Sequence, residues 1–212
     1  MPTILRLETW EIVENRPALT EEDRCYYYMT YYPFSELAVS GEKQTILNLK
    51  ISKEELQENP KRNYWKEKSL REIANLLINT IKHNPVLTDY LWVPAQSSKT
   101  KSDPNYDDRL QQILIRVKQE IPSFKWFDAL SVKKTVEKSR QSNQRNVQEK
   151  LENLHIDPKF VDALSQNKVV VFDDVLTTGA TFKAAQLKIK AANPTIEVIG
   201  IFIAKAVSLN NR

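Results

Sequence analysis

Two adjacent carboxylates, Asp173 and Asp174, directly follow a short apolar run, Val169 to Phe172. The β-branched and aromatic residues of that run are typical of a buried strand. A small, hydroxyl-rich turn follows the acids and leads into a helical pattern. The N-terminus of a helix has unpaired N–H groups and a partial positive charge, which suit a phosphate. Because open α/β sheets bind ligands at the carboxyl ends of their strands, we expect a phosphate-binding turn here with two acids beside it.

The turn consists of Thr177 to Thr181, and its central residue is Gly179, one of only three glycines in the chain. Glycine permits positive φ and a close approach of the backbone to a ligand, and the threonines add hydroxyl donors. A simpler interpretation is an ordinary strand–turn–helix in which Asp174 and Thr177 only cap the helix. We favour the ligand-binding interpretation, because several positions and both flanking elements have to match at once.

This stretch resembles the signature of the type I phosphoribosyltransferases, which is a hydrophobic strand, two acids, an apolar pair and Thr-Thr-Gly-x-Thr. The resemblance implies that the turn holds the 5′-phosphate of phosphoribosyl pyrophosphate (PRPP) and that the acids contact the ribose hydroxyls. The implied catalytic residues are Asp173 and Asp174. The implied phosphate-binding residues are Val175, Leu176, Thr177, Thr178, Gly179, Ala180 and Thr181.

Helical and strand patterns alternate upstream of this motif. Apolar residues at helical spacing predict helices over 69–81 and 110–117, and short apolar runs predict strands over 90–93 and 126–132. Such alternation favours an α/β fold, with a mostly parallel twisted sheet flanked by helices. Right-handed crossovers would then bring the loops after Val93, Val132 and Phe172 to one edge of the sheet.

The polar loop that follows Val93 could bind a second anionic group at that edge. Its serines and lysines offer hydroxyl and cationic donors to a pyrophosphate leaving group. The resemblance places a pyrophosphate-binding loop here, made of Ala95, Gln96, Ser97, Ser98 and Lys99. Composition alone also permits a plain surface loop.

The segment 133–150 carries six basic residues and two acids, a net charge of +4 that equals the formal charge of the whole chain. The remainder is balanced, which argues against a generally basic nucleic-acid coat. The segment could cover an anionic substrate, contact a nucleic-acid backbone, or be a solvated loop and helix face. The resemblance implies a flexible loop in this part of the chain that closes over the site, with Lys133, Lys134 and Arg145.

Residues 1–65 differ in pattern from the rest and are interpreted as a small N-terminal hood, with residues 66–212 as the phosphoribosyltransferase-like domain. Strand propensity is high over 25–32, and 45–51 alternates as a second strand or a short helix, so a β-hairpin is one arrangement. The charged stretch 53–68 is interpreted as a solvated connector. The tyrosines of 25–32 could stack on a base, but packing on the core is favoured.

Further residues resemble the ComF competence-protein family. They are Leu130, Lys133, Lys134 and Thr135, Arg145-Asn146, the stretches 46–50 and 198–205, and Val93-Pro94. The chain departs from that family in two ways. Cys25 is the only cysteine, so the four-cysteine zinc ribbon is missing, and the Arg-rich stretch after the pyrophosphate loop is replaced by residues 103–109.

The resemblance implies an enzyme that displaces pyrophosphate from PRPP with a nitrogen nucleophile of the nucleobase class. Mg²⁺ would be the cofactor, held mainly by PRPP near Asp173 and Asp174. The alternative is a non-catalytic PRPP- or nucleotide-binding protein that acts in DNA uptake, nucleic-acid processing or regulation, with nucleic acid contacting 133–150. No apolar run approaches the ~20 residues that cross a bilayer, and a cytoplasmic protein is expected, with a homodimer as one option. No residue pattern in the sequence indicates the identity of the acceptor.

Overall fold

The computed structural model describes residues 4–33, 41–136, 147–163 and 167–207. These residues form a six-stranded sheet with the order β1-β2-β8-β7-β3-β4, in which all neighbouring strands are parallel except β1 and β2. The strands are β1 (Leu5–Arg6), β2 (Cys25–Tyr31), β3 (Leu91–Pro94), β4 (Lys125–Trp126), β7 (Lys168–Leu176) and β8 (Glu197–Ala206). A separate antiparallel pair consists of β5 (Leu130–Val132) and β6 (Leu154–Ile156). The predicted fold class is confirmed.

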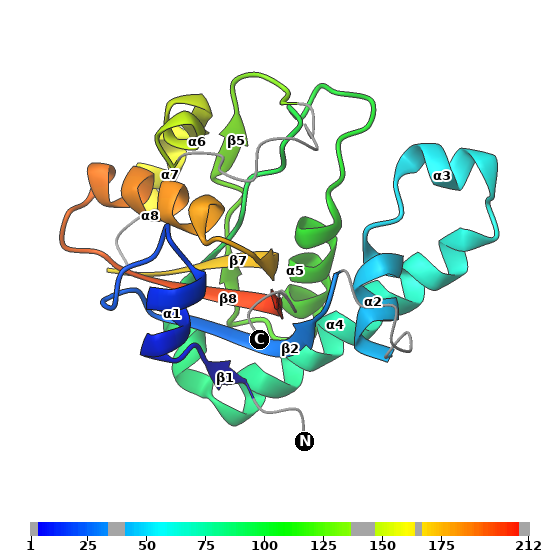
Figure 1. Ribbon diagram of the computed structural model, residues 1–212, viewed down its shortest axis with the longest axis horizontal. Coiled ribbons are helices and arrows are strands. Elements are labelled where there is room, and N and C mark those ends of the chain that lie inside the picture. The colour runs from blue at the N-terminus through cyan, green and yellow to red at the C-terminus, as the bar shows by residue number, and fades with distance from the viewer. Residues whose placement is uncertain (1–3, 34–40, 137–146, 164–166, 208–212) are drawn as a thin grey trace.

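Helices flank both faces of the six-stranded sheet (Figure 1). On one face, Phe182 of α8 packs against Phe202 of β8. On the other, Trp92 of β3 contacts Phe172 of β7, and α5 lies over these strands and packs against α4. The helical elements are α1 (Thr9–Asn15), α2 (Gly41–Leu49), α3 (Lys53–Glu58), α4 (Arg62–His83), η1 (Pro85–Asp89), α5 (Arg109–Glu120), α6 (Val147–Asn153), α7 (Pro158–Ala163) and α8 (Ala180–Ala192).

The central strands and the core helices follow from their apolar patterns. Residues 169–172 of β7 are completely buried, as expected for a parallel strand that is covered on both faces. In α4 the residues at helical spacing, including Leu70, Ile73, Leu77 and Ile81, are all buried. The predicted helices and the strand at 90–93 are therefore confirmed, although α4 begins earlier than predicted, at Arg62.

Two predicted strands differ in the structure. Residues 45–49 belong to helix α2, so the strand interpretation of 45–51 is wrong and the helix alternative is right. Ile46 and Leu49 are fully buried, and three-residue spacing places them on one face of the helix. The predicted strand 126–132 is divided between β4 and β5, because the chain turns where Ala129 donates its N–H to the carbonyl of Phe127.

The N-terminal segment contributes to the main sheet. β2 lies between β1 and β8 and runs parallel to β8, so no hairpin joins residues 25–31 to 45–51. Tyr27 is buried, and Tyr26 and Tyr28 pack against the core, as the packing interpretation of these tyrosines predicts. The expected connector 53–68 contains α3 and the first turns of α4, and Figure 1 shows α3 projecting from the body of the molecule.

Candidate functional site

A polar cavity of about 960 Å³ opens at the carboxyl edge of the parallel strands. Its floor includes Asp173 and Asp174 of β7, which is a central strand of the sheet. The strand extends to Leu176, so both acids lie within it rather than after it. The walls come from the loop after β3, the start of α5, the segment after β5, helix α6 and the junction of α2 with α3. The cavity therefore lies where open α/β sheets place their ligands.

Strand alternation directs the two acids to opposite faces of the sheet. Asp173 is in register with Phe202, which packs against α8, whereas Asp174 reaches Arg109 at the start of α5. Both carboxylates line the cavity because it surrounds the end of the strand. A ligand in this cavity could be contacted from both sides of β7.

The turn after β7 has the conformation that its sequence predicts. Gly179 has φ +85°, in the left-handed region, and α8 begins at the next residue. The structure also packs the N-terminal segment onto the turn, where the N–H of Ala18 donates to the carbonyl of Thr178 at 3.3 Å. A Cβ at position 179 would lie 2.5 Å from Cγ of Leu19. Glycine is therefore required here by backbone conformation and by packing.

Two of the three threonines of this turn face the cavity, whereas Oγ1 of Thr178 accepts a hydrogen bond from the N–H of Ala180 at 3.4 Å. Thr177 and Thr181 line the cavity, and Thr177 is exposed. The first turn of α8 leaves backbone N–H groups without acceptors within the helix. Hydroxyl and N–H donors thus meet at the positive end of a helix, an arrangement that suits a phosphate.

The loop after β3 forms the opposite wall, and all of Ala95 to Lys99 line the cavity. The N–H of Ala95 donates to the carbonyl of Phe172 at 2.8 Å, which aligns the loop with β7. Ser98 accepts a hydrogen bond from the N–H of Val136 at 2.8 Å, so the chain after β5 is bound to this loop. The structure therefore brings the loop together with the two acids and the threonine turn.

The predicted basic loop is only partly within the described residues. Lys133 donates from Nζ to the carbonyl of Glu152 at 2.7 Å, and the N–H of Lys134 donates to Asn153. Neither lysine lines the cavity, whereas Thr135 and Val136 do. Arg145 lies outside the described residues.

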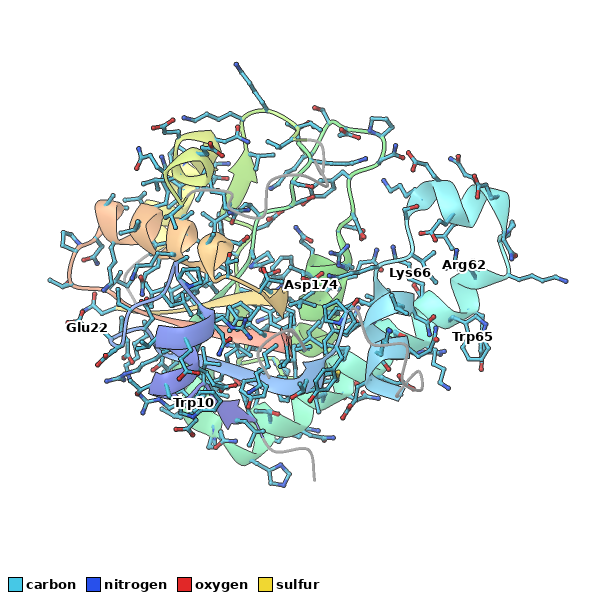
Figure 2. The ribbon with its side chains drawn as sticks, in the orientation of Figure 1. Trp10, Glu22, Arg62, Trp65, Lys66 and Asp174 are labelled. Atoms are coloured by element: carbon cyan, nitrogen blue, oxygen red, sulfur yellow. The ribbon has the colours of Figure 1, made fainter. Side chains whose placement is uncertain are left out.

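A cluster of charges at the cavity was not predicted. Asp174 is 7% exposed, and its Oδ2 lies 2.6 Å from Nη2 of Arg109 and 3.4 Å from Nζ of Lys50. Arg109 also pairs with Asp107, which lies 3.5 Å from Nζ of the buried Lys66. Figure 2 shows Lys66 on α4 and Asp174 at the end of β7. The nearby charges Asp107 and Arg109 were the available signal, but Lys66 and Asp174, which they contact, lie far away in the sequence.

These contacts give the two acids different proton affinities. Burial acts against the charged form of Asp174, but Arg109 and Lys50 hold the pKa of its carboxyl well below its usual range. Burial, followed by the negative charge of Asp174, raises the pKa of Asp173 to about 7. Asp174 is therefore ionised under ordinary conditions, whereas Asp173 can gain or lose a proton near neutral pH.

The fold and the site define an α/β protein with a charged, polar cavity at the carboxyl edge of its sheet. In comparisons with known proteins, no family model matches the sequence and no curated protein matches it. Within the described ranges there is no group of three or more His, Cys, Asp or Glu residues that could hold a metal ion. No helix in the described part of the chain is long and apolar enough to cross a membrane.

Proposed function

We propose that the protein binds PRPP and transfers its phosphoribosyl group to a nitrogen acceptor of the nucleobase class, releasing pyrophosphate. The observation that carries the proposal is the convergence of three elements on one cavity: Thr177 and Thr181 of the turn after β7, the two acids of β7 and the loop 95–99. In chemical type, the first element suits a phosphate, the second a sugar diol and the third a pyrophosphate. The resemblance to type I phosphoribosyltransferases supports the same assignment.

Each element has a role in this proposal. The turn of Thr177 to Thr181 and the start of α8 hold the 5′-phosphate, and the loop 95–99 holds the pyrophosphate. The acids bind the ribose hydroxyls and stabilise the positive charge that develops at C1 as the bond to pyrophosphate breaks. Asp173 has one oxygen bonded to the N–H of Asp174, and its other oxygen has no partner among the described residues. It is therefore the acid that can accept a proton from the attacking nitrogen.

The residues present fit a magnesium ion that is bound mainly through the substrate. The described chain offers no protein cage of three carboxylates, and Asp174 is already paired with two cations. The pyrophosphate and ribose oxygens would therefore supply most ligands, and Asp173 is the nearby carboxylate with a free oxygen. When bound, the ion neutralises charge on the leaving group.

Calorimetric titration with PRPP and Mg²⁺ tests the proposal. We expect micromolar binding by the wild-type protein, and loss of binding when Asp173→Asn and Asp174→Asn are combined. The matched control is Asp89→Asn, since Asp89 is exposed and does not line the cavity. The absence of binding by the folded wild-type protein would refute the proposal.

The main alternative is a protein that binds PRPP or a nucleotide without transferring it, as a regulator or in nucleic-acid processing. The observation that favours it is the pairing of Asp174 with Arg109 and Lys50, which occupies an acid that the transfer requires. A screen of nucleobases for release of pyrophosphate separates the two functions, because binding alone releases none. Salt-dependent DNA binding that is lost on neutralising Lys133 and Lys134 would support the nucleic-acid role.

A further inference from the structure

The Asp174 carboxylate already accepts one hydrogen bond at each oxygen, and a second cation approaches one of them. An ionised carboxylate has about four lone-pair positions. The N–H of Val175 donates to Oδ1 at 2.6 Å, and Arg109 and Lys50 both approach Oδ2. A sugar diol that binds both oxygens of this acid has to compete with the two side chains at Oδ2. The backbone N–H is fixed in the strand, so the displaced donor must be a side chain.

Arg109 is the donor whose surroundings allow such a displacement. Its guanidinium is anchored to Asp107, which also accepts a hydrogen bond at 3.1 Å from the backbone N–H of Arg109. Lys66 lies beside Asp107 and donates to the carbonyl of Ile51 at 2.7 Å, which ties this anchor to α4 and to the end of α2. An Arg109 released from Asp174 would therefore remain at the cavity, held by Asp107.

The guanidinium also has unused donor capacity. Arginine has five N–H donors, and the buried Nε of Arg109 has no hydrogen-bond partner among the described residues. Arg109 lines the same cavity as the loop 95–99. A planar guanidinium that leaves a carboxylate can bind a phosphate oxygen pair with equal geometry.

We propose that Arg109 couples the two ends of the ligand: the sugar diol replaces it on Asp174, and the freed guanidinium binds the diphosphate. The inference rests on the proposed function. It adds that binding of the diol and binding of the diphosphate depend on each other through Arg109. A diphosphate alone would remove Arg109 from a buried carboxylate and leave that charge without a donor. A diol alone would leave the guanidinium without its second anion. Only a ligand that has both a diol and a diphosphate provides new partners for Asp174 and for Arg109. Each of the two ligand groups therefore assists binding of the other.

The first experiment measures this coupling in the intact protein with two separate fragments. One is pyrophosphate with Mg²⁺, and the other is 1,4-anhydroribitol 5-phosphate, which has the diol and the phosphate but no group at C1. Calorimetry gives the affinity for each fragment alone and in the presence of the other. We expect each to strengthen binding of the other by about tenfold, within the range usual for coupled sites. Arg109→Met should reduce this factor to about one.

Arg116→Met is the matched control for that variant. Arg116 lies two turns further along α5, pairs with Glu67 at 2.7 Å and does not line the cavity. The coupling should be unchanged in this protein. If it is lost there too, the effect comes from α5 in general and not from Arg109, which would overturn the inference.

Asp174→Asn gives a second test that does not depend on the folding of Arg109→Met. Without the charge on residue 174, Arg109 is held less tightly, so pyrophosphate should bind several-fold more tightly than to wild type. Anhydroribitol 5-phosphate should bind more weakly, because the amide is a poorer acceptor for the diol. Loss of affinity for both fragments would indicate a merely structural role and overturn the inference.

The outcomes also separate this inference from the proposed function. If the wild-type protein binds neither PRPP nor the fragments, the proposed function fails and the inference fails with it. If PRPP and both fragments bind, but the fragments bind independently, the proposed function survives and the coupling through Arg109 is refuted.

Discussion

Replacing Asp173 by asparagine should make the protein more stable at neutral pH, with a gain that disappears in acid. Burial and the neighbouring charge of Asp174 raise the pKa of Asp173 from its ordinary value of 3.8 to about 7. Between these two values the folded protein binds more protons at this site than the unfolded chain does. The stability that this site contributes is therefore fully present below pH 3.8 and is lost as the pH rises through about 7. Asparagine does not titrate, so the variant escapes this loss.

The size of the effect follows from the pKa. Moving it from 3.8 to about 7 corresponds to roughly 4 kcal/mol, at about 1.36 kcal/mol for each pH unit. The side chain of Asp173 is only partly buried, so water screens some of this energy. We therefore expect Asp173→Asn to raise the free energy of unfolding by about 2 kcal/mol above neutral pH. In a chain of 212 residues, this corresponds to a Tm about 4–8 °C higher.

Urea denaturation at about pH 4.5, 6 and 7.5 measures the free energy of unfolding of both proteins under the same conditions. The difference between them should be smallest at the lowest pH and grow steadily toward the highest. Asp89→Asn, at an exposed position, is the control for the loss of one carboxylate. A difference that does not depend on pH, or a variant less stable than wild type at the highest pH, would refute this account of the two acids.

Three further variants or reactions test other parts of the structure. Gly179→Ala should cost about 2–4 kcal/mol in urea denaturation, because φ is +85° and the new Cβ would meet a leucine side chain. Gly41→Ala, with open space around its Cβ, should cost nothing, and equal losses would contradict the reasoning. Lys205→Met should cost roughly 3 kcal/mol, measured by thermal denaturation, because it leaves Glu11 buried without its partner; an unchanged Tm would contradict this. Burial raises the pKa of the Cys25 thiol, so a thiol reagent should label it only as the protein unfolds; rapid labelling of the native protein would contradict it.

Features that depend on a few neighbouring residues could be predicted from the sequence. The apolar run 169–172 has to be covered on both faces, and the turn at Gly179 has to reverse the chain within a few residues. Both requirements are local, and the structure has the buried strand and the positive φ. The α/β class followed from the alternation of such elements along the chain.

The stretch 45–51 shows where a local pattern is insufficient. Its alternation favours a strand, although the same residues also permit a short helix. Ile46 and Leu49 are fully buried in a helix that packs against α4. The tertiary partner therefore decides the local structure, and that partner is not visible within the stretch itself.

The charged cluster of the site could not be predicted for a similar reason. Asp174 and Arg109 are separated by 65 residues, and Lys66 and Asp107 by 41. The chain contains 31 Lys and Arg residues, and nothing in a single sequence says which of them reaches a particular carboxylate. The types of residue at the site were readable, but the pairs that give the two acids different charges depend on the packing of α4 and α5 against the sheet.

The position of β8 has a consequence for the order in which the molecule can be assembled. β8 lies between β7 and β2, although it is the last of the described strands to be synthesised. Until it emerges from the ribosome, β2 has only the two-residue β1 as a strand partner in this sheet, and its tyrosines lack the surface on which they pack. Many domains fold progressively from the N-terminus during synthesis, but this sheet cannot form in that order. Its closure is a late event that pairs β2 with β8 at high sequence separation, where folding is intrinsically slow.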